Sequence, residues 1–352
     1  MSFIQIILFP ISLIYSLVTA VRNMLYDFHI LKSKSFNMPL ISVGNLSYGG
    51  TGKTPMVEYL IKLLKDDMHI ATLSRGYKRN TKGFVQANIN STAAEIGDEP
   101  RQFKSKFPEI TVAVCEDRCE GVDQLLQSQN DLGCILLDDA FQHRSIKAGL
   151  NILLTDYNRL YTKDHVLPSG TLREWRASAK RADIIVVTKC PKLLSATGRK
   201  VITDNIAPRT NQHIFFSYIE YQPLKHLNGT AEMSNAKIDF LTLFSGIAAV
   251  EPLEEYLMGL TGSMDSIHFG DHHNYSDSDL IRIKESFNNF AAQNKIIVTT
   301  EKDVMRIETL WAKEALKELP IYYIPIMLDL FSDDKEKFNT LITAYVENAR
   351  KN

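Results

Sequence analysis

Short apolar runs alternate along the chain with longer segments in which apolar residues recur every three or four positions. The runs have the length of strands, and the first six span 41–46, 69–74, 111–114, 134–137, 151–155 and 183–188. After the first run, helical spacing is followed by Met56, Val57, Leu60, Ile61 and Leu64. Apolar strands alternating with amphipathic helices predict an α/β fold with a mostly parallel sheet flanked by helices.

The alternation weakens between residues 208 and 237 and then resumes. Later runs of strand length span 239–247, 266–269, 295–299 and 321–326. We therefore predict an N-terminal helix at 1–24, a first domain at 25–220 and a smaller α/β domain at 221–352.

The N-terminal segment is the most apolar part of the chain. Phe3 to Val21 is almost entirely apolar, and Arg22 is its first charge. Neither a basic segment before it nor a small-residue cleavage site after it indicates a cleaved signal peptide. The segment could span a membrane, lie in one leaflet or form a buried helix. We favour attachment within one leaflet, because Arg22, Lys32 and Lys34 follow on the side that must hold the nucleotide site.

The first strand leads into a glycine-rich turn and then a helix, which is the context that a phosphate-binding P-loop requires. Backbone N–H groups and the helix N-terminus favour an anion there. Lys53 is expected to reach the β- and γ-phosphates, and Thr54 to bind Mg²⁺. Ser47 stands at the first glycine position of the usual pattern. We predict a P-loop NTPase-like domain whose nucleotide-binding residues are Ser47, Gly49, Gly50, Thr51, Gly52, Lys53 and Thr54.

Two carboxylates end a second apolar strand, which matches the Walker-B pattern. Cys134 to Leu137 precede Asp138 and Asp139. Adjacent strand residues point to opposite faces, so both carboxylates can serve one metal ion only if the strand ends between them. We assign Asp138 to the metal and leave the role of Asp139 open between metal-site chemistry and a structural turn.

Asp98 has two interpretations. With Pro100 two residues later, it has the pattern of a helix N-cap, and local sequence favours this interpretation. A loop carboxylate in a phosphoryl-transfer enzyme could instead accept the proton of the substrate hydroxyl.

Three other motifs limit the choice of ligand. Thr188-Lys189 resembles the guanine-reading motif of GTPases, but Pro191 stands where its aspartate belongs, which argues against GTP. The later run at 300–303 matches T-x-K-D in letters and stays unresolved. A metal cluster at 271–273 is disfavoured, because adjacent histidines rarely face one ion.

Overall composition excludes some classes of function. The 352 residues carry a net charge of −1, so no general attraction to nucleic acid is implied. The four cysteines have no disulfide-framework spacing, which is typical of free thiols in a reducing compartment.

Taken together, the motifs resemble those of the tetraacyldisaccharide 4'-kinases, enzymes that make lipid A in the inner membrane of Gram-negative bacteria. The resemblance covers nearly the whole chain. It rests on the order and spacing of the segments 43–55, 73–77, 97–100, 138–143, 172–174 and 269–275.

The resemblance implies that ATP, with Mg²⁺, phosphorylates the 4'-hydroxyl of an acylated glucosamine disaccharide 1-phosphate. It implies a general base at Asp98, its partner at His272, and an acidic catalytic residue at Asp139. It implies substrate-binding residues at Arg75, Arg118, Gln142, His143, Arg173 and Glu174. It also implies a location on the cytoplasmic face of the inner membrane, anchored by the N-terminal helix, and no obligate protein partner.

Two other classes of function share the P-loop. A regulatory switch or ATPase would hydrolyse nucleotide without any lipid. A nucleotide-binding scaffold would be unaffected by loss of Asp98.

Overall fold

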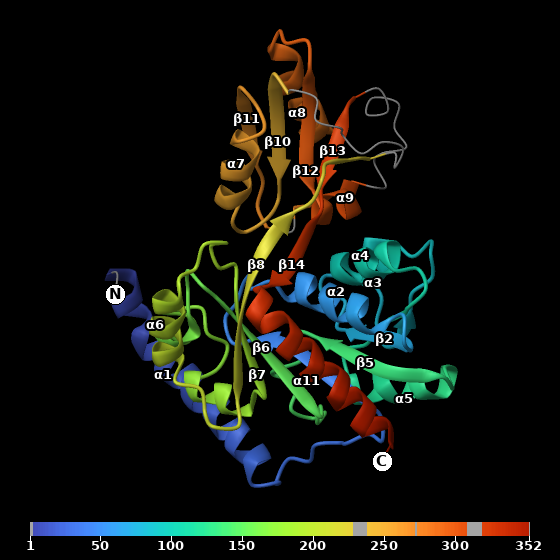
Figure 1. The fold of residues 1–352 in the computed structure, drawn as a ribbon, viewed down its shortest axis with the longest axis vertical. Coiled ribbons are helices and arrows are strands. Elements are labelled where there is room, and N and C mark those ends of the chain that lie inside the picture. The colour runs from blue at the N-terminus through green and yellow to red at the C-terminus, as the bar shows by residue number, and fades with distance from the viewer. Residues whose placement is uncertain (1–2, 228–237, 272, 308–318, 352) are drawn as a thin grey trace. The chain divides into compact units, whose positions relative to one another are not determined.

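The computed structural model describes residues 3–227, 238–271, 273–307 and 319–351, and the chain forms two compact units (Figure 1). The first unit comprises residues 1–220 and 328–352, and the second comprises 221–327. Whereas we predicted a second domain running to residue 352, the structure places 328–352 with the first unit.

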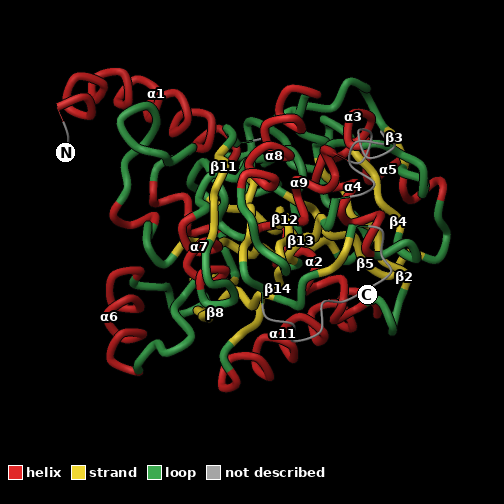
Figure 2. The backbone as a smooth tube through the Cα atoms, turned by 90° about the horizontal axis from the view of Figure 1, so that it is seen from above, coloured by secondary structure: helices red, strands yellow, loops and turns green. Residues whose placement is uncertain are grey.

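The first unit follows the predicted alternation of strands and helices. Figure 2 colours the helices red and the strands yellow along the backbone. Its strands are β1 (Leu40–Asn45), β2 (His69–Ser74), β3 (Val85–Gln86), β4 (Thr111–Val114), β5 (Leu132–Asp138), β6 (Leu150–Asp156), β7 (Ile184–Thr188), β8 (His213–Tyr221) and β14 (Ile326–Leu330). Its helices are α1 (Phe3–Asp27), α2 (Lys53–Leu64), α3 (Ala93–Ile96), α4 (Asp98–Lys106), α5 (Arg118–Ser128), α6 (Ala196–Ile206) and α11 (Ser332–Lys351).

These strands form one sheet in the order β14-β8-β7-β6-β1-β5-β2-β4-β3. The pairs from β8 to β4 are parallel, and β3 is antiparallel at the edge. In such a sheet the carboxyl ends of the strands meet at one edge, where ligands bind. The strand before the P-loop, β1, is central, between β5 and β6.

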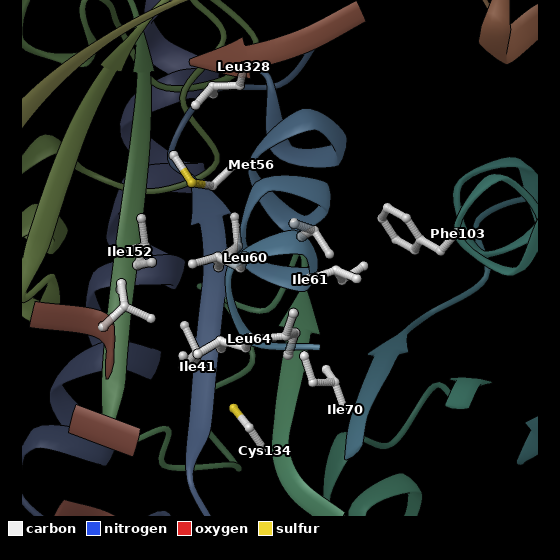
Figure 3. Close-up of a cluster of buried hydrophobic side chains, with 14 of the residues drawn as sticks. Ile41, Met56, Leu60, Ile61, Leu64, Ile70, Phe103, Cys134, Ile152 and Leu328 are labelled. Atoms are coloured by element: carbon white, nitrogen blue, oxygen red, sulfur yellow. The ribbon is translucent and has the colours of Figure 1, made fainter. Parts of the chain in front are cut away.

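Successive residues of the central strands serve two separate cores, as expected for strands covered on both faces. Ile41 and Val43 of β1 join the core under α2 and α11, whereas Leu40 joins the core under α5. The first core is shown in Figure 3, where Met56, Leu60 and other side chains of α2 pack on the strands. This double covering fixes the strand register and hence the place of every residue at the carboxyl edge.

The C-terminal helix α11 completes that first core. Its Phe338 is fully buried and meets Tyr59 of α2 and Phe215 of β8 edge to face, with ring centroids 5.8 and 5.3 Å apart. Tyr345 donates a hydrogen bond to the carbonyl of Leu40 at 3.0 Å. An apolar face at helical spacing explains why α11 belongs with the first sheet, a partner that sequence proximity does not reveal.

The second unit is a smaller α/β unit. Its elements are β9 (Lys225–His226), β10 (Phe240–Ser245), α7 (Glu251–Met258), β11 (Met264–His268), α8 (Asp277–Asn289), β12 (Lys295–Thr300), α9 (Glu301–Ile307) and β13 (Ile321–Ile324). The sheet order is β11-β10-β12-β13-β9, parallel except for β9.

The packing of α11 predicts a stability effect in the first unit. Phe338→Ala should lower its free energy of unfolding by about 3–5 kcal/mol, since a buried aromatic ring is replaced by a cavity. Urea denaturation, with the unfolding of the first unit monitored by hydrogen exchange in β1 and β5, measures this change. Lys337→Ala, at an exposed position of the same helix, is the control. Equal stability of the two variants would contradict the placement of α11.

Candidate active site

The P-loop connects β1 to α2, and two of its glycines adopt backbone conformations that other residues disfavour. Gly49 has φ 109° and Gly52 has φ 84°, a left-handed region that side chains disfavour. Gly52 is also the N-cap of α2. These two positions therefore require glycine, and the helix N-terminus faces the loop.

Ser47, the departure from the usual pattern, lies in ordinary backbone conformation and is 4% exposed. It forms an antiparallel bridge with Leu172, and the Tyr48 N–H donates to the carbonyl of Thr171 at 2.6 Å. A glycine is not needed here, because a neighbouring segment holds the start of the loop.

Lys53, the first residue of α2, lies between an amide and a carboxylate. Its Nζ is 3.5 Å from Asn45 Oδ1 and 3.7 Å from Asp139 Oδ1. The Asn45 amide donates to Thr51 Oγ1 at 2.7 Å. Asn45 at the end of β1 thus connects the P-loop threonine to the P-loop lysine.

The acidic pair lies on β5, directly beside β1. Strand β5 ends at Asp138, and Asp139 has φ 49°, so the strand ends between the two carboxylates as a shared site requires. Asp138 is 6% exposed, and its Oδ1 has no hydrogen-bond partner in the described part of the chain. Burial, and then the charge of Asp139, raise the pKa of Asp138 to about 7.

Asp139 has the opposite electrostatic environment. Arg173 donates to both its carboxylate oxygens, at 2.9 and 3.0 Å. Burial alone would raise the pKa of Asp139, but Lys53 and Arg173 together hold it below the usual value. Asp139 is therefore an ionised bridge between two cations.

The residues present fit a divalent cation next to bound phosphate. Asp138 offers a buried carboxylate oxygen without a partner, and the Thr54 hydroxyl makes no hydrogen bond to any described residue. No group of three or more His, Cys, Asp or Glu that could hold a metal occurs among the described residues. One carboxylate and one hydroxyl suit Mg²⁺, which usually completes its shell with water and substrate phosphate.

Arg75, Arg118 and His143, three predicted substrate residues, lie at the carboxyl edge of the first sheet. Two carry positive charge, and the third has its pKa lowered by that charge. Arg118 is 1% exposed and donates to the carbonyls of Cys115 and Glu116, and burial lowers its pKa to about 10. Arg75 is exposed at the end of β2 and has no ion pair within the described ranges. Burial first, and then the charge of Arg118, lower the pKa of His143 to about 4, so His143 is neutral at pH 7.

Asp98 is the first residue of α4, and the N-cap of that helix is Gly97 with φ 93°. The N-cap prediction for Asp98 is thus wrong by one position, because the left-handed backbone that begins the helix needs glycine. A Cβ at Gly97 would lie 3.1 Å from Gly76 Cα. This close approach brings the loop after β2, with Arg75, against the loop of Asp98.

Gln142 and Arg173 connect the acidic pair to the P-loop. Gln142 Nε2 donates to the Asn45 carbonyl at 2.9 Å, and its Oε1 lies 3.4 Å from Arg173 Nη1. The Arg173 N–H donates to the Leu46 carbonyl at 2.7 Å. Arg173 is therefore fixed by its backbone to the P-loop strand and by its side chain to Asp139.

Glu174 has structural partners. It is 2% exposed and accepts from Asn23 of α1 at 2.8 Å and from Arg181 at 2.9 Å. Its role in substrate binding stays a prediction, while its described contacts attach α1 to the site.

Helix α1 makes further polar contacts with the same residues. Tyr15 donates to the Arg173 carbonyl at 3.2 Å, and Arg22 to the Gln142 carbonyl at 3.3 Å. The Ser169 N–H donates to Ser12 Oγ at 2.9 Å. The contacting residues recur at helical spacing, so one polar stripe of α1 faces the first unit.

The predicted catalytic residue His272 lies outside the described residues. The neighbouring His273 pairs with Asp279 at 3.0 Å. In the run at 300–303 that the sequence left open, Asp303 is fully buried and accepts from the Gly246 N–H and the Thr300 hydroxyl, at 3.1 and 2.6 Å. Its described bonds give this aspartate a structural role at the start of α9.

Sequence reasoning missed several residues that shape the P-loop. In the sequence Asn45 indicates only the end of a strand, and Thr188 and Lys189 only an incomplete base-reading motif. Their signal was present, since Asn45 ends the strand before the P-loop, and Thr188 and Lys189 lie at the end of another predicted strand. For Tyr15, Arg22 and Asn23 the signal was their polar character within an apolar helix.

A P-loop after a central parallel strand, with an acidic pair on the neighbouring strand, defines a P-loop nucleotide-binding protein. The family model described as Tetraacyldisaccharide-1-P 4'-kinase matches residues 4–347, and the chain belongs to this family. The resemblance in the sequence is thereby confirmed.

Relatives and a solved structure agree with this membership. Proteins named tetraacyldisaccharide 4'-kinase are 45% identical in Bacteroides thetaiotaomicron, over 97% of this chain and 94% of the relative, and 44% identical in Flavobacterium psychrophilum, over the full length of both. A crystal structure of LpxK from Aquifex aeolicus, described as an "apo" form in complex with ATP, is similar with a TM-score of 0.75. It is 30% identical, and the match covers 97% of this chain and 99% of that one. The α/β fold with an apolar N-terminal helix is confirmed.

The neutral state of His143 predicts a pH dependence of stability. An unfolded chain binds the proton near pH 6.5, but the folded protein binds it only near its pKa of about 4. The histidine therefore costs the fold stability as the pH falls from about 6.5 toward 4. Between pH 7 and pH 5, the wild type should lose roughly 2 kcal/mol more of its free energy of unfolding than His143→Gln does, as measured by urea denaturation. His213→Gln, at an exposed histidine, should behave as the wild type, and equal losses in all three would contradict the prediction.

Proposed function

We propose that this chain transfers the γ-phosphoryl group of ATP to the 4'-hydroxyl of a tetraacylated glucosamine disaccharide 1-phosphate. One observation carries the proposal: Lys53 of the P-loop lies beside the acidic pair on the adjacent strand, 3.7 Å from Asp139. Membership of the kinase family, the names of the relatives and the ATP complex of the LpxK structure indicate the substrates.

The P-loop binds the nucleotide phosphates. Backbone N–H groups of the loop and the N-terminus of α2 face the anion. Lys53 turns from Asp139 toward the β- and γ-phosphate oxygens, and little holds it back, because its contacts of 3.5 and 3.7 Å are too long to be strong. Phosphoryl transfer depends mainly on such positioning and charge neutralisation.

Thr54 and Asp138 would hold Mg²⁺, which neutralises the phosphates when bound. The Asp138 carboxylate oxygen, buried and without a partner among the described residues, would gain one from a cation there. Asp138 would then be ionised, although burial raises the pKa of this group.

Asp98 accepts the proton of the attacking sugar hydroxyl. Its place at the start of α4 stabilises the negatively charged form that a base requires. Asp139 is less available to a substrate hydroxyl, because Arg173 donates to both its carboxylate oxygens. We assign Asp139 to the positioning of these two cations around the reacting phosphate.

The arginines supply charge for the acceptor. Arg75 is exposed and is available to a phosphate of the substrate, with the buried Arg118 behind it. The charge of Arg75 helps to lower the pKa of both Arg118 and His143.

Helix α1 attaches the enzyme to the membrane. It is long and apolar enough to cross one, with 6% of its most apolar stretch buried, so the buried-helix interpretation does not fit. The polar stripe from Ser12 to Asp27 contacts the first unit over about 22 Å, at 1.5 Å per residue. A helix that keeps these contacts lies along the unit, which supports attachment within the cytoplasmic leaflet of the inner membrane rather than spanning.

The kinase proposal predicts a bisphosphorylated lipid from labelled ATP, Mg²⁺ and the disaccharide 1-phosphate. Asp98→Asn should lower kcat by about 10²–10⁴-fold and change KM for ATP much less, because the base acts in the transition state. Asp66→Asn, at an exposed acid of the same unit, is the control. Hydrolysis of ATP without lipid product by the wild type would overturn the function. Unchanged turnover of Asp98→Asn would overturn only the role of Asp98.

Membrane attachment through α1 predicts loss of vesicle binding on charge insertion. Ile14 and Leu17 are each 65% exposed. The double variant Ile14→Glu, Leu17→Glu should reduce partitioning onto phosphatidylethanolamine and phosphatidylglycerol vesicles at least about tenfold, because two apolar contacts are lost. Flotation measures this, and Leu193→Glu, at a 97% exposed leucine outside α1, should float as the wild type does. Normal flotation of the double variant would argue against α1 as the anchor.

A further inference from the structure

The end of strand β7 contacts the P-loop from outside the phosphate site. Thr188 is fully buried, and its Oγ1 lies 2.8 Å from the carbonyl oxygen of Thr51 and 3.2 Å from that of Thr155. A hydroxyl has one proton to donate, and the shorter distance favours the Thr51 carbonyl. The residue therefore fixes the peptide group between Thr51 and Gly52.

Lys189 makes the equivalent contact one peptide earlier. Its Nζ lies 2.5 Å from the carbonyl oxygen of Gly50 and 2.8 Å from a carboxylate oxygen of Asp156. Asp156 ends the neighbouring strand β6, opposite Thr188 in the parallel register. Lys189 has φ 57°, a conformation uncommon for a residue with a side chain. The ends of two adjacent strands thus hold two consecutive P-loop carbonyls.

The orientation of these carbonyls decides where the loop N–H groups point. In a trans peptide the C=O and the following N–H point in opposite directions. Carbonyls of Gly50 and Thr51 that are held toward β7 therefore turn the N–H groups of Thr51 and Gly52 away from it. The Thr51 N–H donates to the Gly49 carbonyl at 3.1 Å, within the loop itself. The Gly52 N–H has no hydrogen-bond acceptor in the residues that the structure describes, as an anion-binding donor requires.

We propose that Thr188, Lys189 and Asp156 are positioning residues for nucleotide binding, which orient the P-loop N–H groups toward the β- and γ-phosphates before ATP arrives. The proposal rests on the proposed function only in that ATP is the ligand. Asp156 neutralises Lys189, so this lysine acts through its bond to Gly50 rather than as a charge for the phosphates. Thr188 and Lys189 resemble the base-reading motif of GTPases, but Pro191 supplies no carboxylate to bind a nucleotide base.

Direct binding of nucleotides to the full-length protein, without lipid acceptor, tests the proposal by calorimetry. Lys189→Met keeps the length of the side chain and removes the donor. It should weaken ATP and ADP binding about tenfold or more, and leave AMP binding, which lacks the β- and γ-phosphates, within about twofold. Lys189→Arg should recover most of the affinity, because its guanidinium can donate to the same carbonyl. Thr188→Val should weaken ATP binding as well, and Thr188→Ser should retain it.

Lys192→Met is the matched control, since Lys192 lies three residues further along, is exposed and pairs with Glu220. Wild-type affinity for ATP in both Lys189→Met and Thr188→Val would overturn the proposal. An equal loss for ATP and AMP would also overturn it, because the effect would then not depend on the phosphates. A wild type that binds ATP but phosphorylates no lipid would refute the proposed function alone, and one that binds no ATP would refute both.

Discussion

Parallel pairing of β1 with β5 is the constraint on which the rest of the site depends. The register sets Val43 opposite Asp138, so the P-loop and the acidic pair leave the same edge of the sheet from neighbouring strands. A slip of one residue would turn Asp138 to the other face of the sheet and put the alternating apolar side chains in the wrong cores. The two cores that cover the strands are therefore what holds a lysine and two carboxylates within reach of one phosphate.

The two carboxylates at the carboxyl edge of the first sheet differ in how their negative charge is balanced. Asp139 is balanced by Lys53 and Arg173 within the protein, whereas Asp138 has no comparable cation in direct contact among the described residues. Asp138 and Asp139 carry the same chemical group. Their different surroundings therefore decide which of them is available to a metal ion. The buried Arg118 adds positive charge near this pair, whereas the nearby His143 is neutral at pH 7.

Much of the fold could be predicted from local pattern. Alternating runs located β1, β2, β4, β5, β6 and β7, and the P-loop and acidic pair were found because their chemistry is contiguous in sequence. The contacts that escaped prediction join distant residues: Tyr345 with Leu40, Tyr15 with Arg173, Lys189 with Gly50. The spacing of apolar residues predicts that a helix has a buried face, but it does not predict which face of which sheet that helix packs against. Asp98 shows the limit at short range, since only the backbone conformation of Gly97 decides where its helix begins.

The return of the chain to its first sheet has a consequence for synthesis. The strand that leaves for the second unit, β8, lies beside the strand that returns, β14, and α11 closes the core only after both. While the ribosome makes residues 221–327, the apolar surfaces of α2 and β1 that Phe338 and Ile342 later cover are open to water. Domains made early usually fold early, but here the unit made first is finished last. Until residues 328–351 have been made, the first core is therefore incomplete, and its uncovered apolar surface is open to aggregation and proteolysis.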